Sequence, residues 1–180
     1  MAGSFGAGER ARKITEEPQV MDSPEHPSVI ELHAYLERLR GGREMADRAD
    51  IKPSEIARLL PHMIIAEAID GGADFRVRLF GTRLVELLGE ERTGKLFSEF
   101  AEEGCACSNK SPDAVQRRWL FVTQKTFLDR KPVFLKVPFV ASGRHCLIGH
   151  CLAAPLTAGG SEPAQTVGAV FVTRADNLPL

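Results

Sequence analysis

The sequence predicts an α+β fold, a five-stranded antiparallel sheet with helices covering one face, preceded by an amphipathic N-terminal helix. Two observations carry this prediction. Two extended stretches, 62–69 and 74–81, flank the turn-forming residues 70–73, which indicates a hairpin. A helix signal over 82–89 follows at once, and this leaves no room for the crossover that a parallel pair of strands needs.

The hairpin has a predicted register. A connection centred on Gly71-Gly72 pairs Ile69 with Asp74 and Glu67 with Arg76. Because side chains alternate along a strand, one face becomes apolar and the other amphipathic. The apolar face carries Ile64, Ala66, Ala68, Phe75, Val77 and Leu79, and the other carries Ile65, Glu67, Arg76 and Arg78.

The region before the hairpin divides into a tail and a helix. Residues 1–27 are rich in Gly, Ala, Glu and Pro without a hydrophobic period, which predicts a disordered tail. A helix should begin at Ser28 as N-cap, with Glu31 completing a capping box, and end at Gly41. Its apolar stripe consists of Val29, Leu32, Leu36 and Leu39. We expect a second copy of the chain to cover this stripe in a homodimer.

The remaining elements follow in order. Pro53 begins a short helix that Pro61 ends, and Thr82 caps a helix that Gly89 ends. A longer helix is predicted over 113–128, and strands over 133–140, 145–156 and 166–173. The domain should therefore span residues 28–175, with a short C-terminal tail over 176–180.

Composition limits the classes of function. The chain has 180 residues and a formal net charge of −1, so no global field favours nucleic acid or an anionic membrane. Its apolar runs are too short for a membrane span, and the N-terminus lacks the apolar core of a signal peptide. We expect a cytoplasmic protein whose four cysteines are reduced thiols.

A series of short motifs runs along the chain. They are Gly42-Arg43, Arg48-Ala49-Asp50-Ile51, Pro53, Leu60-Pro61, Phe75-Arg76-Val77-Arg78-Leu79, Gly81-Thr82, Gly89, Thr93-Gly94 and Ala154-Pro155-Leu156. Together with the order of elements, they resemble a family of small, single-domain, PAS-like bacterial proteins. The resemblance covers residues 28–175, and it implies a sensory or protein-interaction domain with no reaction of its own. The chain departs from the family pattern at Leu36, Ala46 and Lys52, where Trp, Pro and Asp are expected.

Two cysteine-containing stretches were considered as metal or redox sites. In His145-Cys146-Leu147-Ile148-Gly149-His150-Cys151, strand geometry places the same-face His and Cys pairs ~13 and ~20 Å apart, too far to share one zinc ion. We therefore predict no metal site. Cys105 and Cys107 lie in a predicted loop, where unreactive thiols are favoured over a redox sensor.

Arg48, Asp50 and Arg78 allow two interpretations. In the functional one, Arg78 binds an anionic ligand or partner. In the structural one, which we favour, Asp50 pairs with an arginine and locks the N-terminal segment across the outer face of the sheet.

The apolar face of the hairpin predicts either a filled core or a ligand pocket. The small side chains of Ala66 and Ala68 leave room for a pocket. Its candidate residues are Ile64, Ala66, Phe75, Val77, Leu79, Leu84, Leu88, Phe97 and Trp119. The sequence identifies no cofactor.

The predicted function is a non-enzymatic PAS-like sensory module that binds a small molecule and signals to a separate partner protein. One alternative is a ligand carrier or enzyme that uses polar groups at the pocket, for which Thr82, Thr123, Gln124 and Lys136 are candidates. The other is an adaptor with a filled core that binds a protein near Arg76 and Arg78 on the outer face.

Overall fold

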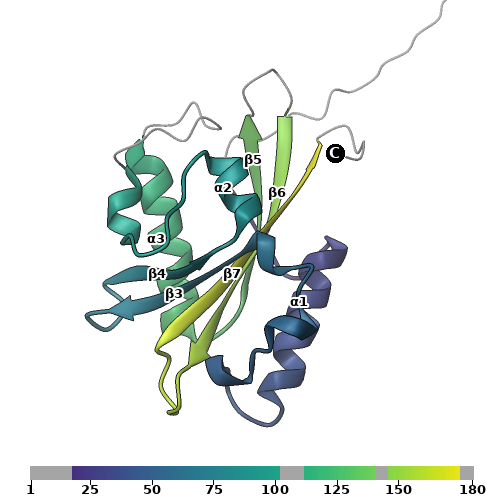
Figure 1. Ribbon diagram of the computed structural model, residues 1–180, viewed down its shortest axis with the longest axis vertical. Helices are drawn as coiled ribbons and strands as arrows, with labels where there is room; N and C mark the ends of the chain where they lie inside the picture. The colour runs from purple at the N-terminus through teal and green to yellow at the C-terminus, as the bar shows by residue number, and fades with distance from the viewer. Residues whose placement is uncertain (1–17, 102–111, 141–145, 175–180) are drawn as a thin grey trace, which may run out of the picture.

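The computed structural model describes residues 18–101, 112–140 and 146–174 (Figure 1). Its strands form one sheet of seven, in the order β1-β5-β6-β7-β3-β4, with β2 beside β6. The strands are β1 (Gln19–Met21), β2 (Ala46–Asp47), β3 (Met63–Ile69), β4 (Asp74–Phe80), β5 (Val133–Val140), β6 (Cys146–Thr157) and β7 (Gln165–Arg174). All pairs are antiparallel except β2 with β6.

The sheet lies between two groups of helices (Figure 1). On one face lie α1 (Pro27–Arg40) and the 3-10 turns η1 (Arg48–Asp50), η2 (Pro53–Glu55) and η3 (Leu60–His62). On the other lie α2 (Thr82–Leu88), the 3-10 helix η4 (Phe97–Ala101) and α3 (Pro112–Asp129). The α+β prediction with an antiparallel sheet and a helix-covered face is confirmed, and two short strands, β1 and β2, add to the five expected.

The β3–β4 hairpin has the predicted register at its tip. Ile69 lies opposite Asp74 and Glu67 opposite Arg76, and the turn over 70–73 uses positive φ angles at Asp70, Gly71 and Gly72. The positive φ angles explain why the turn contains Gly71 and Gly72, because glycine adopts such angles without steric cost.

A β-bulge changes the far end of this hairpin. Ala66 lies opposite Val77 and Ile65 opposite Leu79, so Arg78 is an extra residue in β4. The bulge inverts the alternation beyond it. Leu79 therefore packs on the α1 side, and Phe80 takes its place in the core under α2 and α3. The assignment of Leu79 to the pocket face was wrong for this reason.

The N-terminal region is ordered earlier than the sequence predicts. Strand β1 lies inside the stretch expected to be a tail, and it pairs with β5. Helix α1 begins one residue before Ser28, and its N-cap is His26, whose Nδ1 accepts a hydrogen bond from the Ser28 backbone N–H at 3.2 Å. The predicted capping role of Glu31 is also wrong, since Glu31 pairs with Arg58 instead.

The apolar stripe of α1 is covered by the sheet of its own chain. Val29, Leu32 and Leu36 are at most 5% exposed, and Leu39 packs against the same core. They contact the outer-face side chains of the sheet, among them Met63 and Ile65 of β3. The prediction that this stripe forms the homodimer contact is therefore wrong for these four residues, because the monomer already buries them.

The short helix predicted from Pro53 to Pro61 is wrong: this stretch forms two separate 3-10 turns, η2 and η3, and Pro61 lies inside η3. The other elements agree more closely with expectation. Helix α2 ends at Gly89, which has the predicted left-handed conformation, although its N-cap is Gly81 rather than Thr82. Lys52 precedes η2 without a side-chain cap, as the departure from the family pattern suggested. Strands β5, β6 and β7 lie within one residue of their predicted bounds. The predicted thiols Cys105 and Cys107, His145 and the tail 176–180 lie outside the described residues.

Candidate ligand cavity

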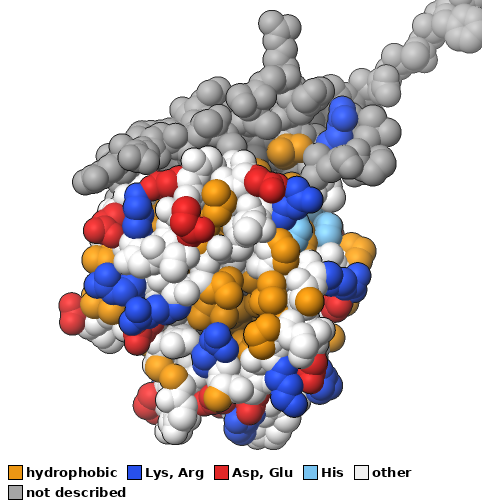
Figure 2. Space-filling view, in the orientation of Figure 1, with side chains coloured by type: hydrophobic (Ala, Val, Ile, Leu, Met, Phe, Trp, Pro, Cys, Tyr) orange, Lys and Arg blue, Asp and Glu red, His pale blue; other side chains and the backbone are white. Residues whose placement is uncertain are grey.

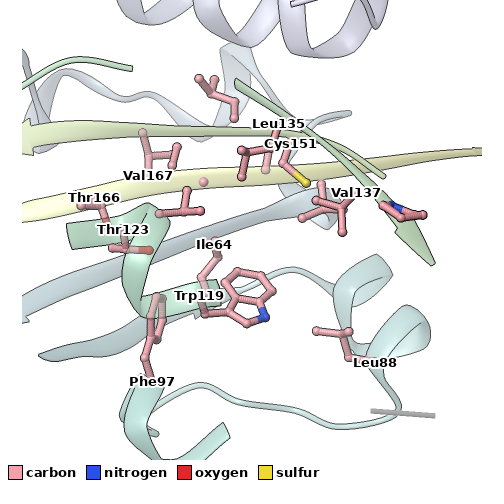
Figure 3. Close-up of a pocket in the computed structure, with 17 residues that line it drawn as sticks. Ile64, Leu88, Phe97, Trp119, Thr123, Leu135, Val137, Cys151, Thr166 and Val167 are labelled. Atoms are coloured by element: carbon pink, nitrogen blue, oxygen red, sulfur yellow. The ribbon is translucent and has the colours of Figure 1, made fainter. Parts of the chain in front are cut away.

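A cavity of about 90 Å³ lies between the sheet and the helices α2, η4 and α3 (Figure 3). Its helix side comes from Leu88, Phe97 and three residues of α3. Its sheet side comes from β3, β5, β6 and β7. The lining residues are Ile64, Leu88, Phe97, Trp119, Val122, Thr123, Leu135, Val137, Pro138, Cys151, Leu152, Ala153, Thr166, Val167, Gly168, Ala169 and Val170.

Helix α3 positions the wall opposite the sheet. Trp119, Val122 and Thr123 fall on one face because they are three or four residues apart. The register of α3 is held near its end by Thr126, which is fully buried and whose Oγ1 lies 3.1 Å from the Ala153 carbonyl oxygen of β6. At the same level Gln124 donates to the carbonyl oxygens of Gly72 and Ala73 in the hairpin turn. The helix is thus fixed to β6 and to the turn between β3 and β4.

Four of the nine predicted pocket residues line the cavity: Ile64, Leu88, Phe97 and Trp119. Four more, Ala66, Phe75, Val77 and Leu84, belong to the same buried cluster but lie behind the lining. Leu79 lies on the opposite face, as described above. The lining residues that sequence reasoning missed come mainly from β5, β6 and β7, whose place next to β3 no local pattern reveals.

The lining is mostly apolar, with a few polar groups. Thr123 and Thr166 are buried, and Cys151 is half-buried (Figure 3). Of the four polar candidates from the sequence, only Thr123 lines the cavity. Gln124 binds the hairpin turn, Lys136 pairs with Glu25, and Thr82 is exposed at the start of α2.

The size of the cavity limits what it can hold. Its volume is about 90 Å³. Pockets for drug-sized ligands measure ~300–1,000 Å³. Cavities with an apolar lining can accept small apolar molecules. The cavity therefore suits a small, mainly apolar ligand.

Asp50 pairs with an arginine, as predicted, but the grouping of Asp50 with Arg48 and Arg78 is wrong. Asp50 pairs with Arg43, with 2.5 Å between Oδ2 and Nη2. Arg78, displaced by the bulge, pairs with Glu67 on the neighbouring strand. Arg48 lies in η1.

Asp47 fastens the N-terminal segment instead. Its carboxylate accepts hydrogen bonds from the Ala49 and Gly159 backbone N–H groups, at 2.8 and 2.7 Å, and from the Thr157 hydroxyl at 2.7 Å. These donors hold the pKa of Asp47 below its usual range, with the Thr157 hydroxyl contributing most. Two of its three hydrogen-bond partners, Thr157 and Gly159, lie more than 100 residues later in the sequence, so no local pattern pointed to its role.

Three histidines gather around Phe171 on the α1 side of the sheet. The rings of His26 and His62 stack on Phe171, with centroids 5.3 and 4.6 Å away, and His26 lies 5.1 Å from His150. Burial lowers the pKa of all three, that of His150 to about 4. The proximity of His26 and of Lys136 lowers the pKa of His150 further.

These histidines do not make a metal site by geometry. Within the described residues, no group of three or more His, Cys, Asp or Glu side chains is arranged to hold a metal ion. Among the same residues, no helix is long and apolar enough to cross a membrane.

Comparison with known proteins identifies the family. A family model for the PAS domain matches residues 24–171, most of the chain, so the chain belongs to the PAS domain family. It has the fold of a signal-sensing domain. A search of curated proteins found no similar sequence.

Similar solved structures are light-oxygen-voltage proteins. An RNA-binding light-oxygen-voltage receptor is 10% identical with a TM-score of 0.47, over 87% of this chain and 38% of the receptor, so the chain spans well under half of that protein. A light-oxygen-voltage domain with a flavin analogue is 13% identical, covering 68% and 87%, with a TM-score of 0.44. A fungal light-oxygen-voltage photoreceptor is 15% identical, covering 81% and 93%, with a TM-score of 0.42.

Proposed function

We propose that this chain is a non-enzymatic PAS sensory module that binds a small molecule in the cavity between the sheet and α3. The cavity itself is the observation that carries the proposal. A core packed to the usual density leaves few voids larger than a water molecule, whereas this one has about 90 Å³ with a mostly apolar lining. This favours a ligand-binding module over an adaptor with a filled core.

The strands beneath the cavity offer a route for the signal. Cys151, Leu152 and Ala153 of β6 all line the cavity, and Leu152 also belongs to the core cluster under α1. In β7, Val170 packs in the core under α2 and α3, and its neighbour Phe171 packs in the core under α1. A ligand that shifts these strands therefore changes the packing of α1. In this mechanism the ligand selects one arrangement of strands and helix from a pre-existing population.

The module would pass its state to a separate signalling protein, and we propose that it does so as a homodimer. Since the sheet buries the apolar stripe of α1, the contact between copies would use other surfaces. Ile30 on α1 and Val20 on β1 are exposed apolar side chains. A monomer in light scattering at high protein concentration would contradict the homodimer.

The ligand proposal is tested by blocking the cavity. Val137 lines the cavity, and Val133 lies two alternations earlier on the same face of β5 without lining it. We expect Val137→Phe to abolish the thermal stabilisation that members of a small-molecule library give to the wild type. Val133→Phe is the matched control, because it adds the same ring to the same strand outside the cavity and should keep the response.

Native mass spectrometry of the same proteins measures occupancy directly. A ligand bound to the wild type and to Val133→Phe, but not to Val137→Phe, supports the proposal. A library without a single stabilising compound, or equal responses from both variants, would overturn it.

A further inference from the structure

Two buried threonines have hydroxyls without a protein partner. In the part of the chain that the structure describes, the buried threonines are Thr123, Thr126, Thr157 and Thr166. The Thr126 hydroxyl reaches two backbone carbonyl oxygens, and the Thr157 hydroxyl donates to Asp47. The hydroxyls of Thr123 and Thr166 make no hydrogen bond within residues 18–101, 112–140 and 146–174. Such hydroxyls are unusual, because an unpaired buried polar group has lost its water contacts without replacement.

The two unpaired hydroxyls belong to the cavity. Thr123 and Thr166 are 6% and 4% exposed, and both line it. Thr126 and Thr157, whose hydroxyls are bonded within the protein, do not line it. The missing partners therefore coincide with the space that a ligand would fill, and a polar atom of that ligand can supply them.

Thr123 and Thr166 come from opposite walls of the cavity, α3 and the sheet. Three residues after Thr123, Thr126 lies 3.1 Å from the Ala153 carbonyl oxygen of β6. Ala153 pairs with Gly168 of β7, which lies two residues from Thr166 and therefore on the same face of the strand. Figure 3 draws both threonines toward the same end of the close-up. A ligand at this end lies between the two walls that carry the hydroxyls.

The lining favours an uncharged ligand. Among the described residues that line the cavity, none is Asp, Glu, Lys, Arg or His. An ion would lose its hydration there without gaining an opposite charge, which is strongly unfavourable. A neutral oxygen suits the site better, because its two lone pairs can accept one hydrogen bond from each hydroxyl.

We propose that the ligand is a small neutral compound with an apolar body and one oxygen, a ketone or an alcohol, whose oxygen accepts hydrogen bonds from the Thr123 and Thr166 hydroxyls. This inference rests on the proposed function, since it names the class of molecule that the cavity binds. The apolar body would lie against side chains such as Trp119 and Val137, which line the same cavity (Figure 3).

The test compares cyclopentanone and cyclopentanol with methylenecyclopentane, which has nearly the same shape as the ketone but no oxygen. Binding is followed by NMR titration, and each affinity is compared between proteins, so that differences in the hydration of the probes cancel. We expect Thr123→Val and Thr166→Val each to weaken the binding of the oxygen compounds about fivefold, the usual contribution of one hydrogen bond, and to keep the binding of methylenecyclopentane. The oxygen compound that the wild type binds more tightly identifies the ligand as a ketone or an alcohol.

Thr82→Val is the matched control, because it makes the same change at an exposed threonine at the start of α2. It should keep the affinity for all three probes. An equal loss of affinity in Thr82→Val would show that the effect does not come from the cavity hydroxyls, and would overturn the inference.

Thermal unfolding without ligand separates a ligand contact from a structural one. Since the hydroxyls of Thr123 and Thr166 have no acceptor to lose, Thr123→Val and Thr166→Val should melt no lower than the wild type. Thr126→Val removes a hydroxyl that has protein acceptors, so it should melt at a lower temperature. An equal loss in all three variants would assign the cavity hydroxyls a structural role and overturn the inference.

Alanine variants cover the case in which a valine variant does not fold. Thr123→Ala and Thr166→Ala remove the same hydroxyls with a smaller side chain, and the same loss of affinity for the oxygen compounds is expected. Failure of both substitutions at one position would mean that the hydroxyl is needed for folding, and would overturn the inference.

This inference and the proposed function fail in different ways. Affinity for the oxygen compounds that survives in either valine variant overturns the inference and leaves the cavity as a site for another ligand. Probe binding that Val137→Phe does not weaken overturns the cavity as the site, and with it the proposed function. If none of the three probes binds while another library compound does, the inference alone is wrong.

Discussion

Asp47 connects the segment between α1 and β3 to the end of β6. Its carboxylate is 8% exposed and accepts three hydrogen bonds, two of them from residues more than 100 positions later in the sequence. Hydrogen bonds to a charged group are stronger than neutral ones, and their loss leaves the donors unpaired as well. The short parallel pairing of β2 with β6 depends on this side chain.

Replacing Asp47 tests this role. We expect Asp47→Ala to lower the free energy of unfolding by about 3 kcal/mol, because the Thr157 hydroxyl and the Gly159 N–H lose their acceptor. Denaturant unfolding followed by circular dichroism measures the change. Asp50→Ala is the matched control, since Asp50 makes an exposed ion pair worth less than about 1 kcal/mol. Equal effects of the two substitutions would show that Asp47 does not lock the segment.

At the level of elements, the passage from β4 to α2 brings the backbone of Gly81 close to the backbone of η3. Gly81 lies against the backbone of η3, where an added Cβ would meet the Pro61 carbonyl oxygen at 2.2 Å. Its own N–H donates to the Met63 carbonyl oxygen at 2.8 Å. The glycine therefore lets η3, the start of β3 and the start of α2 come together. A side chain there would push them apart.

We expect Gly81→Ala to destabilise the protein by about 3 kcal/mol, since the contact is with backbone atoms that cannot move aside as a side chain would. Thermal unfolding gives the measurement. Gly42→Ala serves as the control, because a Cβ at Gly42 has nothing within 4 Å. A stable Gly81→Ala protein would mean that η3 can shift without cost.

The success of sequence reasoning also differs from element to element. The hairpin tip was predictable because its turn needs glycine and its strands alternate strictly. The bulge at Arg78 was not, since the extra residue leaves no turn signature, and Leu79 was misplaced as a result. Asp47 was missed because its partners lie far away in the sequence. The cavity was found only in part, since β5, β6 and β7 meet β3 through tertiary structure that no local pattern encodes.

Over the whole molecule, the histidines near Phe171 join α1, η3, β6 and β7. His26 caps α1, His62 approaches the Val170 carbonyl oxygen at 3.3 Å, and His150 lies 3.0 Å from the Thr173 hydroxyl. Glu25 and Lys136 lie beside His150, and Arg83 and Glu86 beside His62. The neutral imidazoles thus contact four elements that approach from different parts of the chain. Their protonation is therefore coupled to the folding of the whole domain.

The pH dependence of stability follows from these lowered pKa values. The unfolded chain binds protons at these histidines below about pH 6.5, whereas folded His150 does so only near its pKa of about 4. Stability should therefore be fully present above pH 6.5 and fall as the pH drops toward 4. Melting temperatures across this range measure the loss. His150→Gln should flatten the slope between pH 6.5 and 5, where carboxylates contribute little, and an unchanged slope would contradict the assignment.

The position of β7 has a consequence for how the chain is made. This strand is the last described element in sequence order, yet it lies between β6 and β3 and is the link between the β3–β4 hairpin and the β5–β6 pair. Until residues 165–174 leave the ribosome, no strand joins the two halves of the sheet. The nascent polypeptide therefore completes its tertiary structure only after β7 has been synthesised, and stalling translation earlier should leave the hairpin sensitive to protease.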